Sequence, residues 1–500
     1  MTVRATAEFS GTDPRTGERA PGAYVDATAA EVAAAARAAR AAFLSEGDRR
    51  TFSDAALLRA VAEQIDARAA ELCEAAERET GLTSARLTGE VARTTGQLRA
   101  FADVVDSGEL LEPIVDAADP AATPPRPDQR RMNLPIGVVA VWGAGNFPFA
   151  FGVAGGDTAA AFAAGCPVVV KAHPSHPRTS ELTAEAVHAA LLSVGASSAW
   201  FSLLQGREHA TGVCLATCDD VDAVAFTGSR SGGLALVRAA AERPRPIPVY
   251  AEMGAVNPTV VTPAAASARG AQIAQELGGA IVASNGQLCT KPGIIALVDD
   301  GAARALVGTL AELLAAGESQ PLLDSRTKEA FVRGADELAA APAVEVIARG
   351  AETDRPGSWQ APLLAQVAAS ALTSGVTQVE EVFGPAAVVA WCADEAELLK
   401  LLESLEPALA AGLYAEAEEA ALHPIMVRLQ RKVGRLVFDG ITTGVTVGRA
   451  TVHGGPFPAT SIDGHTSVGM TAPRRFLRPV GFQGFPEAAL PAALRRRAAS

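Results

Sequence analysis

The sequence predicts an α/β protein with two doubly wound, Rossmann-like domains and a small β arm. Its 500 residues are too many for one hydrophobic core, so two or three packed domains are expected. Short apolar runs alternate with helical patterns along two long stretches, as in parallel sheets covered by helices. A proline- and alanine-rich segment, residues 116–128, precedes these stretches and indicates an extended arm.

The amino-terminal part predicts three helices. The first is expected over residues 28–43 and should begin at Thr28, because Glu31 completes a capping box. Apolar residues at three- and four-residue spacing predict two more, over about 53–79 and 84–105.

A first strand-helix alternation follows the arm. The apolar run 138–142 predicts a buried parallel strand. Further helices are expected over 151–164, 179–194 and 208–216, and strands over 167–171, 200–204 and 222–226. This order predicts a doubly wound sheet, whose ligands bind at the carboxyl ends of the strands.

Two glycine-containing turns are candidates for phosphate binding. Residues 143–145 begin like a dinucleotide fingerprint, but Pro148 stands where its third glycine belongs. Residues 226–233 are the better candidate, since a strand end enters a helix there, and free N–H groups with the helix dipole favour an anion.

A second alternating stretch runs from residue 257 to about 440. Its helices are expected near 265–280, 302–315, 326–340 and 394–404. Beyond it, residues 474–482 could form an extended segment that pairs with 130–138. Strand pairing of this kind across subunits would give a homodimer or homotetramer.

Composition excludes several classes of partner. The net charge of −13 argues against nucleic acid and anionic membranes, which need clustered Lys and Arg. Residues 1–8 lack the apolar core of a secretion signal, and no window approaches about 18 apolar residues, so a cytoplasmic protein is expected. The six cysteines are too scattered for a disulfide framework, and no Cys/His cluster predicts a metal.

Cys289 is the candidate nucleophile. It lies among small, polar and turn-forming residues, which suits an exposed sulfur. An unassisted thiol with a pKa of about 8.5 is little ionised at pH 7, so catalysis requires a base. Glu252 is a lone carboxylate in an uncharged segment, where desolvation should raise its pKa and make it a competent base. The alternative is that Cys289 is a small buried hydrophobic residue.

Five segments resemble signature motifs of the aldehyde dehydrogenase family and occur in the family's order. They are residues 143–148, 226–229, 251–258, 285–289 and 380–385. The resemblance extends over essentially the whole chain. It implies the aldehyde dehydrogenase fold, a small-molecule aldehyde as substrate, and NAD or NADP as cofactor.

The resemblance also implies the chemical roles. Cys289 would attack the aldehyde carbonyl, and the Asn146 amide with the Cys289 backbone N–H would stabilise the oxyanion. After hydride transfer, Glu252 would activate the water that hydrolyses the thioester. The corresponding domains are a cofactor-binding domain (1–115 and 139–255), a catalytic domain (256–450), and an oligomerisation arm and tail (116–138 and 471–500).

Cofactor contacts follow from the same resemblance. It implies Lys171 at the adenosine ribose, Gly228 and Ser229 at the pyrophosphate, Glu381 at the nicotinamide ribose, Phe383 beside the ring, and further contacts from Trp142 and Arg207. The chain departs from many NAD-preferring relatives by carrying Pro174 in place of a glutamate. Loss of that carboxylate removes a ribose acceptor and a repulsion of a 2′-phosphate, so NADP is favoured, with Arg207 or Arg178 as a further cation.

Four segments resemble the branch of the family that oxidises 2,5-dioxopentanoate (α-ketoglutarate semialdehyde) to 2-oxoglutarate. They are residues 89–98, 154–158, 171–174 and 452–456. The far end of this substrate is an α-keto acid, so a cation is expected at the tunnel mouth, and Arg93 with Gln97 is the proposed clamp, near Phe147. Arg93 and Gln97 could instead form an ordinary solvated helix face.

Other activities remain open at this stage. A long-chain fatty aldehyde dehydrogenase and a succinate semialdehyde dehydrogenase are the alternatives within the family. Outside it stand a cysteine-dependent thioester or ester hydrolase and a catalytically silent binding homologue. The intact set of Cys289, Glu252, Asn146, Lys171 and Glu381 argues against silence.

Overall fold

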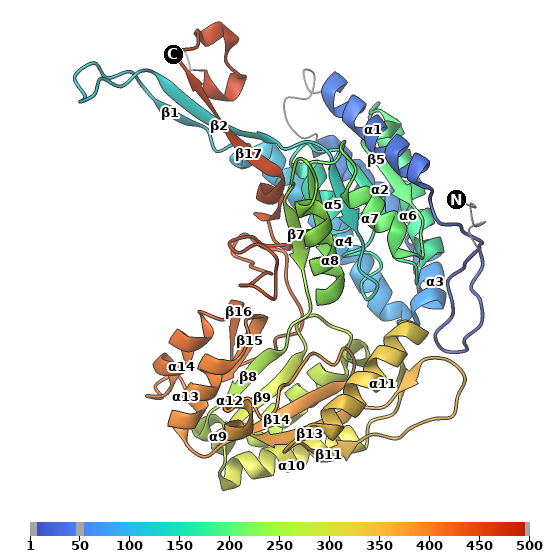
Figure 1. Ribbon diagram of the computed structural model, residues 1–500, viewed down its shortest axis with the longest axis vertical. Coiled ribbons are helices and arrows are strands. Elements are labelled where there is room, and N and C mark those ends of the chain that lie inside the picture. Colours follow the sequence, from blue (N-terminus) through green and yellow to red (C-terminus); the bar gives the residue numbers. More distant parts are fainter. Residues whose placement is uncertain (1–7, 47–54, 496–500) are drawn as a thin grey trace.

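The computed structural model describes residues 8–46 and 55–495. Expectations for residues 1–7, for the start of the 53–79 helix and for 496–500 lie outside these ranges. Two lobes lie one above the other, and a thin arm extends from the upper lobe (Figure 1). No helix within the described residues is long and apolar enough to cross a membrane.

The upper lobe contains a five-stranded parallel sheet in the order β5-β4-β3-β6-β7. Its strands are β3 (Val139–Trp142), β4 (Val168–Lys171), β5 (Phe201–Leu204), β6 (Ala223–Thr227) and β7 (Val249–Glu252). Its helices are α1 (Ala29–Glu46), α2 (Ala55–Ala67), α3 (Ala69–Thr80), α4 (Ser84–Ser107), α5 (Gly156–Ala163), α6 (Pro177–Ser193), α7 (His209–Ala216) and α8 (Arg230–Ala241). The predicted doubly wound arrangement is confirmed.

Helix ends follow the local signals in some places and tertiary contacts in others. The capping box of α1 is present, since the backbone N–H of Thr28 donates to Glu31 Oε2 at 2.8 Å. The predicted single helix over 53–79 is wrong, because Arg68 leaves helical geometry (φ −109°, ψ 13°) and divides it into α2 and α3. The helix expected from residue 151 begins at Gly156.

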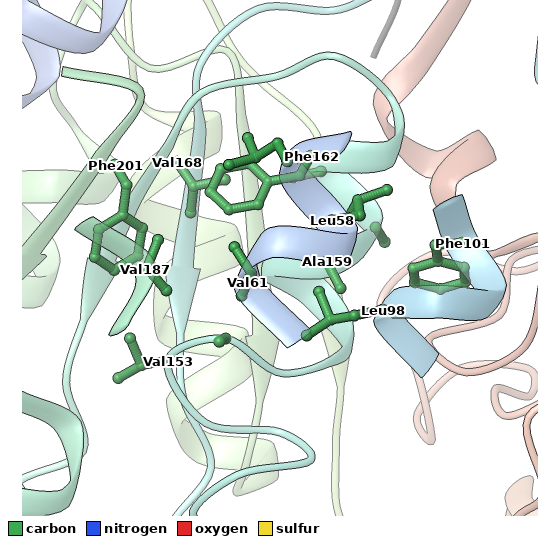
Figure 2. Close-up of a cluster of buried hydrophobic side chains, with 14 of the residues drawn as sticks. Leu58, Val61, Leu98, Phe101, Val153, Ala159, Phe162, Val168, Val187 and Phe201 are labelled. Carbon is green, nitrogen blue, oxygen red and sulfur yellow. The ribbon is translucent and has the colours of Figure 1, made fainter. Parts of the chain in front are cut away.

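The main core of the upper lobe lies between the sheet and helices α2, α4, α5 and α6. Figure 2 shows Leu58 and Val61 of α2 close to Leu98 of α4 and Phe162 of α5. All four side chains are buried. This packing fixes the position of α4, whose other face reaches the site described below.

The lower lobe contains a seven-stranded sheet in the order β11-β13-β14-β9-β8-β15-β16, parallel except for β11. The strands are β8 (Asn257–Val261), β9 (Pro292–Val298), β11 (Glu345–Arg349), β13 (Leu363–Ala368), β14 (Ala386–Cys392), β15 (Ala408–Tyr414) and β16 (Val433–Phe438). The helices are α9 (Pro263–Val282), α10 (Gly301–Ala315), α11 (Ser325–Ala340), α12 (Ala369–Thr373), α13 (Glu395–Ser404) and α14 (Leu422–Leu429). Two short strands, β10 (Gln320–Pro321) and β12 (Trp359–Gln360), pair with each other in a separate two-stranded sheet.

The arm is a three-stranded antiparallel sheet of β1 (Ile114–Asp116), β2 (Gln129–Pro135) and β17 (Leu477–Gln483). Strand β17 pairs with β2 along its whole length, from Leu477 opposite Pro135 to Gln483 opposite Gln129. The predicted pairing of these two distant segments is confirmed. Figure 1 shows that the arm points away from both lobes.

Candidate active site

Three reactive side chains meet between the lobes. Glu252 ends β7, and its Oε2 lies 2.9 Å from Nε2 of His453. The same His453 nitrogen lies 3.6 Å from Sγ of Cys289. Glu252 and His453 are buried, whereas Cys289 is partly exposed. The cluster therefore joins a partly exposed cysteine to a shielded acid-base pair.

The loop that presents Cys289 has an unusual backbone. After α9, Ser284 and Asn285 both adopt left-handed conformations with φ of 49°. The Asn285 side chain holds this turn by donating to the Gln320 carbonyl at 2.7 Å. Gly286 has φ +67°, and a Cβ there would lie 2.1 Å from the Gly384 carbonyl oxygen. Glycine is therefore required where the Cys289 loop packs against the 381–384 loop.

Asn257 fixes the other side of the cysteine. Its Nδ2 donates to the backbone carbonyls of Cys289, at 2.9 Å, and Lys291, at 3.1 Å. Its Oδ1 accepts from the Ala410 N–H at 3.1 Å. A buried side chain with partners on both ends is rigid, so the backbone at Cys289 is preorganised.

Asn146 reaches the same loop from the upper lobe. Its Nδ2 donates to the backbone carbonyl of Gln287 at 2.8 Å, two residues before Cys289. A side-chain amide carries two N–H donors, so one remains for an oxygen at the reacting carbon. The structure thus brings Asn146, Glu252 and Cys289 together.

The pKa shifts at the site have opposite signs. Burial raises the pKa of Cys289, and the Glu252 charge raises it further. Burial also acts to raise the pKa of Glu252, but the His453 charge and hydrogen bonds from His453 and Ser467 outweigh it, so the net shift is downward. The predicted rise was therefore wrong. At neutral pH Glu252 is a carboxylate beside a neutral thiol, and the thiolate forms only as it attacks.

Replacing His453 with glutamine should shift the acidic limb of the kcat/KM profile for aldehyde oxidation to higher pH. The substitution removes the charge of His453, the largest contribution that holds the Glu252 pKa down, while burial still raises that pKa. The base form of Glu252 is then lost at a higher pH as the solution is acidified. Initial rates from pH 5 to 10 would test this, and an unmoved acidic limb would contradict it.

Sequence reasoning assigned no catalytic role to His453 or Asn257. His453 lies in segment 452–456 and Asn257 lies in segment 251–258, both of which resemble family motifs. Only that membership in a motif could have indicated a role for either residue. The reactive atoms of Glu252, Cys289 and His453 all lie within 4.8 Å of one another, a spacing that could also hold a metal ion. The expectation of no metal stays a prediction.

The turn from β6 into α8 suits a pyrophosphate. Ser229 caps α8, with its Oγ accepting from the Gly232 N–H at 3.2 Å. A Cβ on Gly228 would lie 2.7 Å from the ring of Phe226, so only glycine lets the backbone lie this close to the ring. The Gly228 N–H donates to the Glu252 carbonyl at 3.1 Å, which joins this turn to the reactive cluster.

The adenosine end is expected at the end of β4. Lys171 is buried, its Nζ donates to the Gly206 carbonyl at 2.6 Å, and burial lowers its pKa to about 8. Arg207, the residue after Gly206 in the sequence, is exposed. Its backbone N–H donates to Asp26 Oδ1. Trp142 is buried in the core, and a Cβ on Gly212 of α7 would lie 2.9 Å from its Nε1.

Glu381 and Phe383 lie in the loop that packs on the Cys289 turn. A Cβ on Gly254 would lie 1.9 Å from Glu381 Oε2, so this carboxylate sits directly over the segment after Glu252. Burial raises the Glu381 pKa to about 7, against the opposing charge of Lys291. Phe383 is partly buried. The Glu381 carboxylate and the Gly286 turn thus lie where the 381–384 loop packs on the Cys289 loop, and both fit the expected nicotinamide end of the cofactor.

The expected substrate residues fall into two places. Arg93 lies over the ring of Phe151, 5.4 Å from its centroid, and donates to the Val445 carbonyl at 3.3 Å. Phe147 packs edge-on against Phe151 at 5.3 Å. Gln97 is buried and turned toward α5, and its Nε2 has no hydrogen-bond partner among the described residues. Arg93 and Phe147 thus both contact Phe151, whereas Gln97 Nε2 lies beside Gly156 at the start of α5. The predicted clamp of Arg93 with Gln97 stays a prediction.

The doubly wound fold and a site that joins a cysteine to a carboxylate fit the dehydrogenase class. The profile of the Aldehyde dehydrogenase family matches residues 3–453, and the chain belongs to that family. It is accordingly an NAD(P)-dependent enzyme that oxidises aldehydes.

Two curated relatives are similar over most of their length. Alpha-ketoglutaric semialdehyde dehydrogenase 2 of Azospirillum brasilense is 45% identical over 94% of this chain and 89% of the relative. Alpha-ketoglutaric semialdehyde dehydrogenase of Acinetobacter baylyi is 42% identical over 94% of this chain and 90% of the relative. Among solved structures, PnpE from Pseudomonas sp. WBC-3 matches with a TM-score of 0.80 and 22% identity, over 99% of this chain and 96% of PnpE. That last likeness concerns the fold alone.

Proposed function

We propose that the protein oxidises 2,5-dioxopentanoate to 2-oxoglutarate. The observation that carries this proposal is the 45% and 42% identity to two α-ketoglutaric semialdehyde dehydrogenases over 94% of the chain. The physical support is Arg93, a cation beside the aromatic wall near Cys289. Its charge interacts with both Cys289 and Glu252, which supports a role for Arg93 in binding a short substrate at the sulfur.

In the proposed mechanism, Cys289 Sγ bonds to the aldehyde carbon while its proton passes to Glu252. The Asn146 amide and the Cys289 N–H donate to the oxygen that becomes negative. The bound nicotinamide cofactor supplies the hydride acceptor. Glu252 releases this proton to solvent before it deprotonates the water that attacks the thioester. The hydrogen bond from His453, at 2.9 Å, favours the return of Glu252 to its carboxylate form. The acid leaves and the sulfur is regenerated.

The preferred cofactor is proposed to be NADP. Pro174 leaves no carboxylate at the position where many NAD-preferring relatives carry one, and Lys171 and Arg207 both lie near the expected ribose. The Asp26 carboxylate accepts hydrogen bonds from the backbone N–H groups of Arg207 and Glu208. These two bonds partly offset the negative charge of Asp26, which would otherwise repel a 2′-phosphate. Comparing kcat/KM with NAD and NADP tests this proposal, and a large NAD preference would contradict it.

Replacing Arg93 with alanine should raise KM for 2,5-dioxopentanoate about 10- to 100-fold, with little change in kcat. The reason is that the hydrogen bonds of Arg93 to the Val445 carbonyl are long, 3.3–3.4 Å, and leave Arg93 able to bind an anion. A charge-assisted bond to a substrate carboxylate is worth about 1.5–3 kcal/mol. The matched control is Arg99→Ala on the same helix, where the arginine pairs with Asp66 at the surface. An equal rise in KM for hexanal, which carries no charge, would refute the clamp.

A panel of aldehydes with both cofactors tests the proposed activity itself. The highest kcat/KM is expected for 2,5-dioxopentanoate, above succinate semialdehyde and a long-chain aldehyde. The long-chain aldehyde is the second candidate because Phe147, Phe151, Val445 and Val447 form an apolar cluster near the sulfur. Ester hydrolysis with no reduction of either cofactor would instead favour the hydrolase.

We further propose a cytoplasmic homodimer or homotetramer. The arm carries exposed apolar side chains at Ile114 and Val115 (46% and 45% exposed). Strand β16 lies at the edge of the seven-stranded sheet and exposes Leu436 and Phe438. Unpaired strand edges with apolar side chains favour pairing between copies. Light scattering of the purified protein would give the subunit count.

A further inference from the structure

One face of α4 carries a buried carboxylate that the proposed chemistry does not use. Glu90 is 2% exposed. Its Oε1 accepts the backbone N–H groups of Phe149 and Ala150, each at 2.9 Å. These two residues belong to the loop between β3 and α5, which also carries Asn146. A carboxylate that accepts two N–H groups from one loop fixes the conformation of that loop.

Arg86, one turn earlier on α4, connects this loop to the other half of the site. Its Nη1 pairs with Glu90 Oε2 at 2.5 Å. Its Nε donates to Oγ of Ser284 at 3.3 Å, and Ser284 is one of the two left-handed residues that open the Cys289 turn. Its guanidinium also lies over the ring of Phe147, 4.5 Å from the centroid. Arg86 therefore contacts the residue after Asn146 and the turn before Cys289 at once.

We propose that the Arg86–Glu90 pair is a positioning device that sets the Asn146 amide against Cys289. The two loops come from different lobes, and Asn146 must aim at an oxygen on the carbon that Cys289 attacks. A misplacement of about 1 Å in such a site can cost about 100-fold in rate. Because Glu90 holds the Asn146 loop and Arg86 ties Glu90 to the Cys289 turn, the pair controls that distance. The inference rests on the role proposed for Asn146.

A purely structural role is the competing explanation. Burying a carboxylate requires a cationic partner, and Arg86 would then serve only to keep the lobe folded. The two explanations differ in how substitutions combine. If Arg86 acts through Asn146, replacing Arg86 should have little further effect on kcat/KM once the Asn146 amide is gone. If Arg86 only supports the fold, its loss should lower kcat/KM by the same factor with or without that amide.

The test is a double-substitution cycle on kcat/KM, run with both 2,5-dioxopentanoate and hexanal. Asn146→Ala should lower kcat/KM about 100-fold or more, and Arg86→Met about tenfold or more. In the Asn146→Ala background, Arg86→Met should lower it by less than about threefold. Both aldehydes should respond alike, because the pair is not a substrate clamp. Arg86→Lys keeps the cation beside Glu90 and should restore most of the activity.

Arg99→Met on the same helix is the matched control and should leave kcat/KM unchanged, since Arg99 pairs with Asp66 at the surface. Thermal unfolding of each variant reports the fold, and Glu90→Gln replaces Arg86→Met in the cycle if the latter is unfolded. Additive losses would overturn the positioning role, as would full activity in Arg86→Met. Full activity in Asn146→Ala alone would instead refute the role proposed for Asn146, and the inference with it.

Discussion

Replacing Cys289 with alanine is expected to abolish aldehyde oxidation, with kcat falling about 10⁴-fold or more while the cofactor still binds. Loss of an attacking atom removes the whole covalent route, and what remains is binding alone. Because the pKa of this thiol is raised, Cys289 is protonated before the substrate binds. It attacks while its proton leaves, and no neighbouring group can take over that step.

The measurement is the initial rate of NAD(P)H formation, with cofactor binding followed by fluorescence quenching. The matched control is Cys218→Ala, a partly buried cysteine in the core cluster of β3 and α7, which should keep the wild-type rate. Residual oxidation by the Cys289→Ala enzyme within tenfold of wild type would show that another group forms the bond to carbon.

Much of the fold could be predicted because its determinants are local. Strands β3 and β4 are continuous apolar runs, and the start of α1 is set by a capping box within four residues. The break between α2 and α3 could not be predicted, because Arg68 leaves the helix where it contacts α6, through Leu182 and Glu185. No pattern in the 53–79 sequence contains those partners.

The late start of α5 has a similar cause. Two backbone N–H groups of residues 143–155 donate to Glu90 and are therefore not free for helical hydrogen bonds. The same loop folds tightly on itself at Gly152, where a Cβ would lie 1.9 Å from the Pro148 carbonyl oxygen. The candidate nucleophile and base were found from their motifs, but His453 was missed. It meets Cys289 across 164 residues of sequence, and only the packing of the two loops reveals the contact.

Replacing Glu252 with glutamine should separate the two halves of the reaction. One equivalent of NAD(P)H per site should form rapidly, and the steady-state rate should then be about 10³-fold below wild type. In this variant His453 no longer faces a carboxylate, so its Nε2, 3.6 Å from the Cys289 sulfur, becomes free to take the thiol proton, and attack and hydride transfer slow less. Hydrolysis loses its ionised carboxylate, and general-base catalysis contributes about 10²- to 10⁴-fold.

Rapid mixing with excess aldehyde and cofactor would resolve the burst, and acid quenching would trap the acyl group on Cys289 for mass spectrometry. Glu403→Gln, at an exposed glutamate that pairs with Arg428, is the control and should turn over normally. If burst and steady state fell together, Glu252 would be needed before hydride transfer, and its chief task would be to deprotonate the sulfur. In that event His453, at 3.6 Å from the sulfur, does not replace Glu252 in that step.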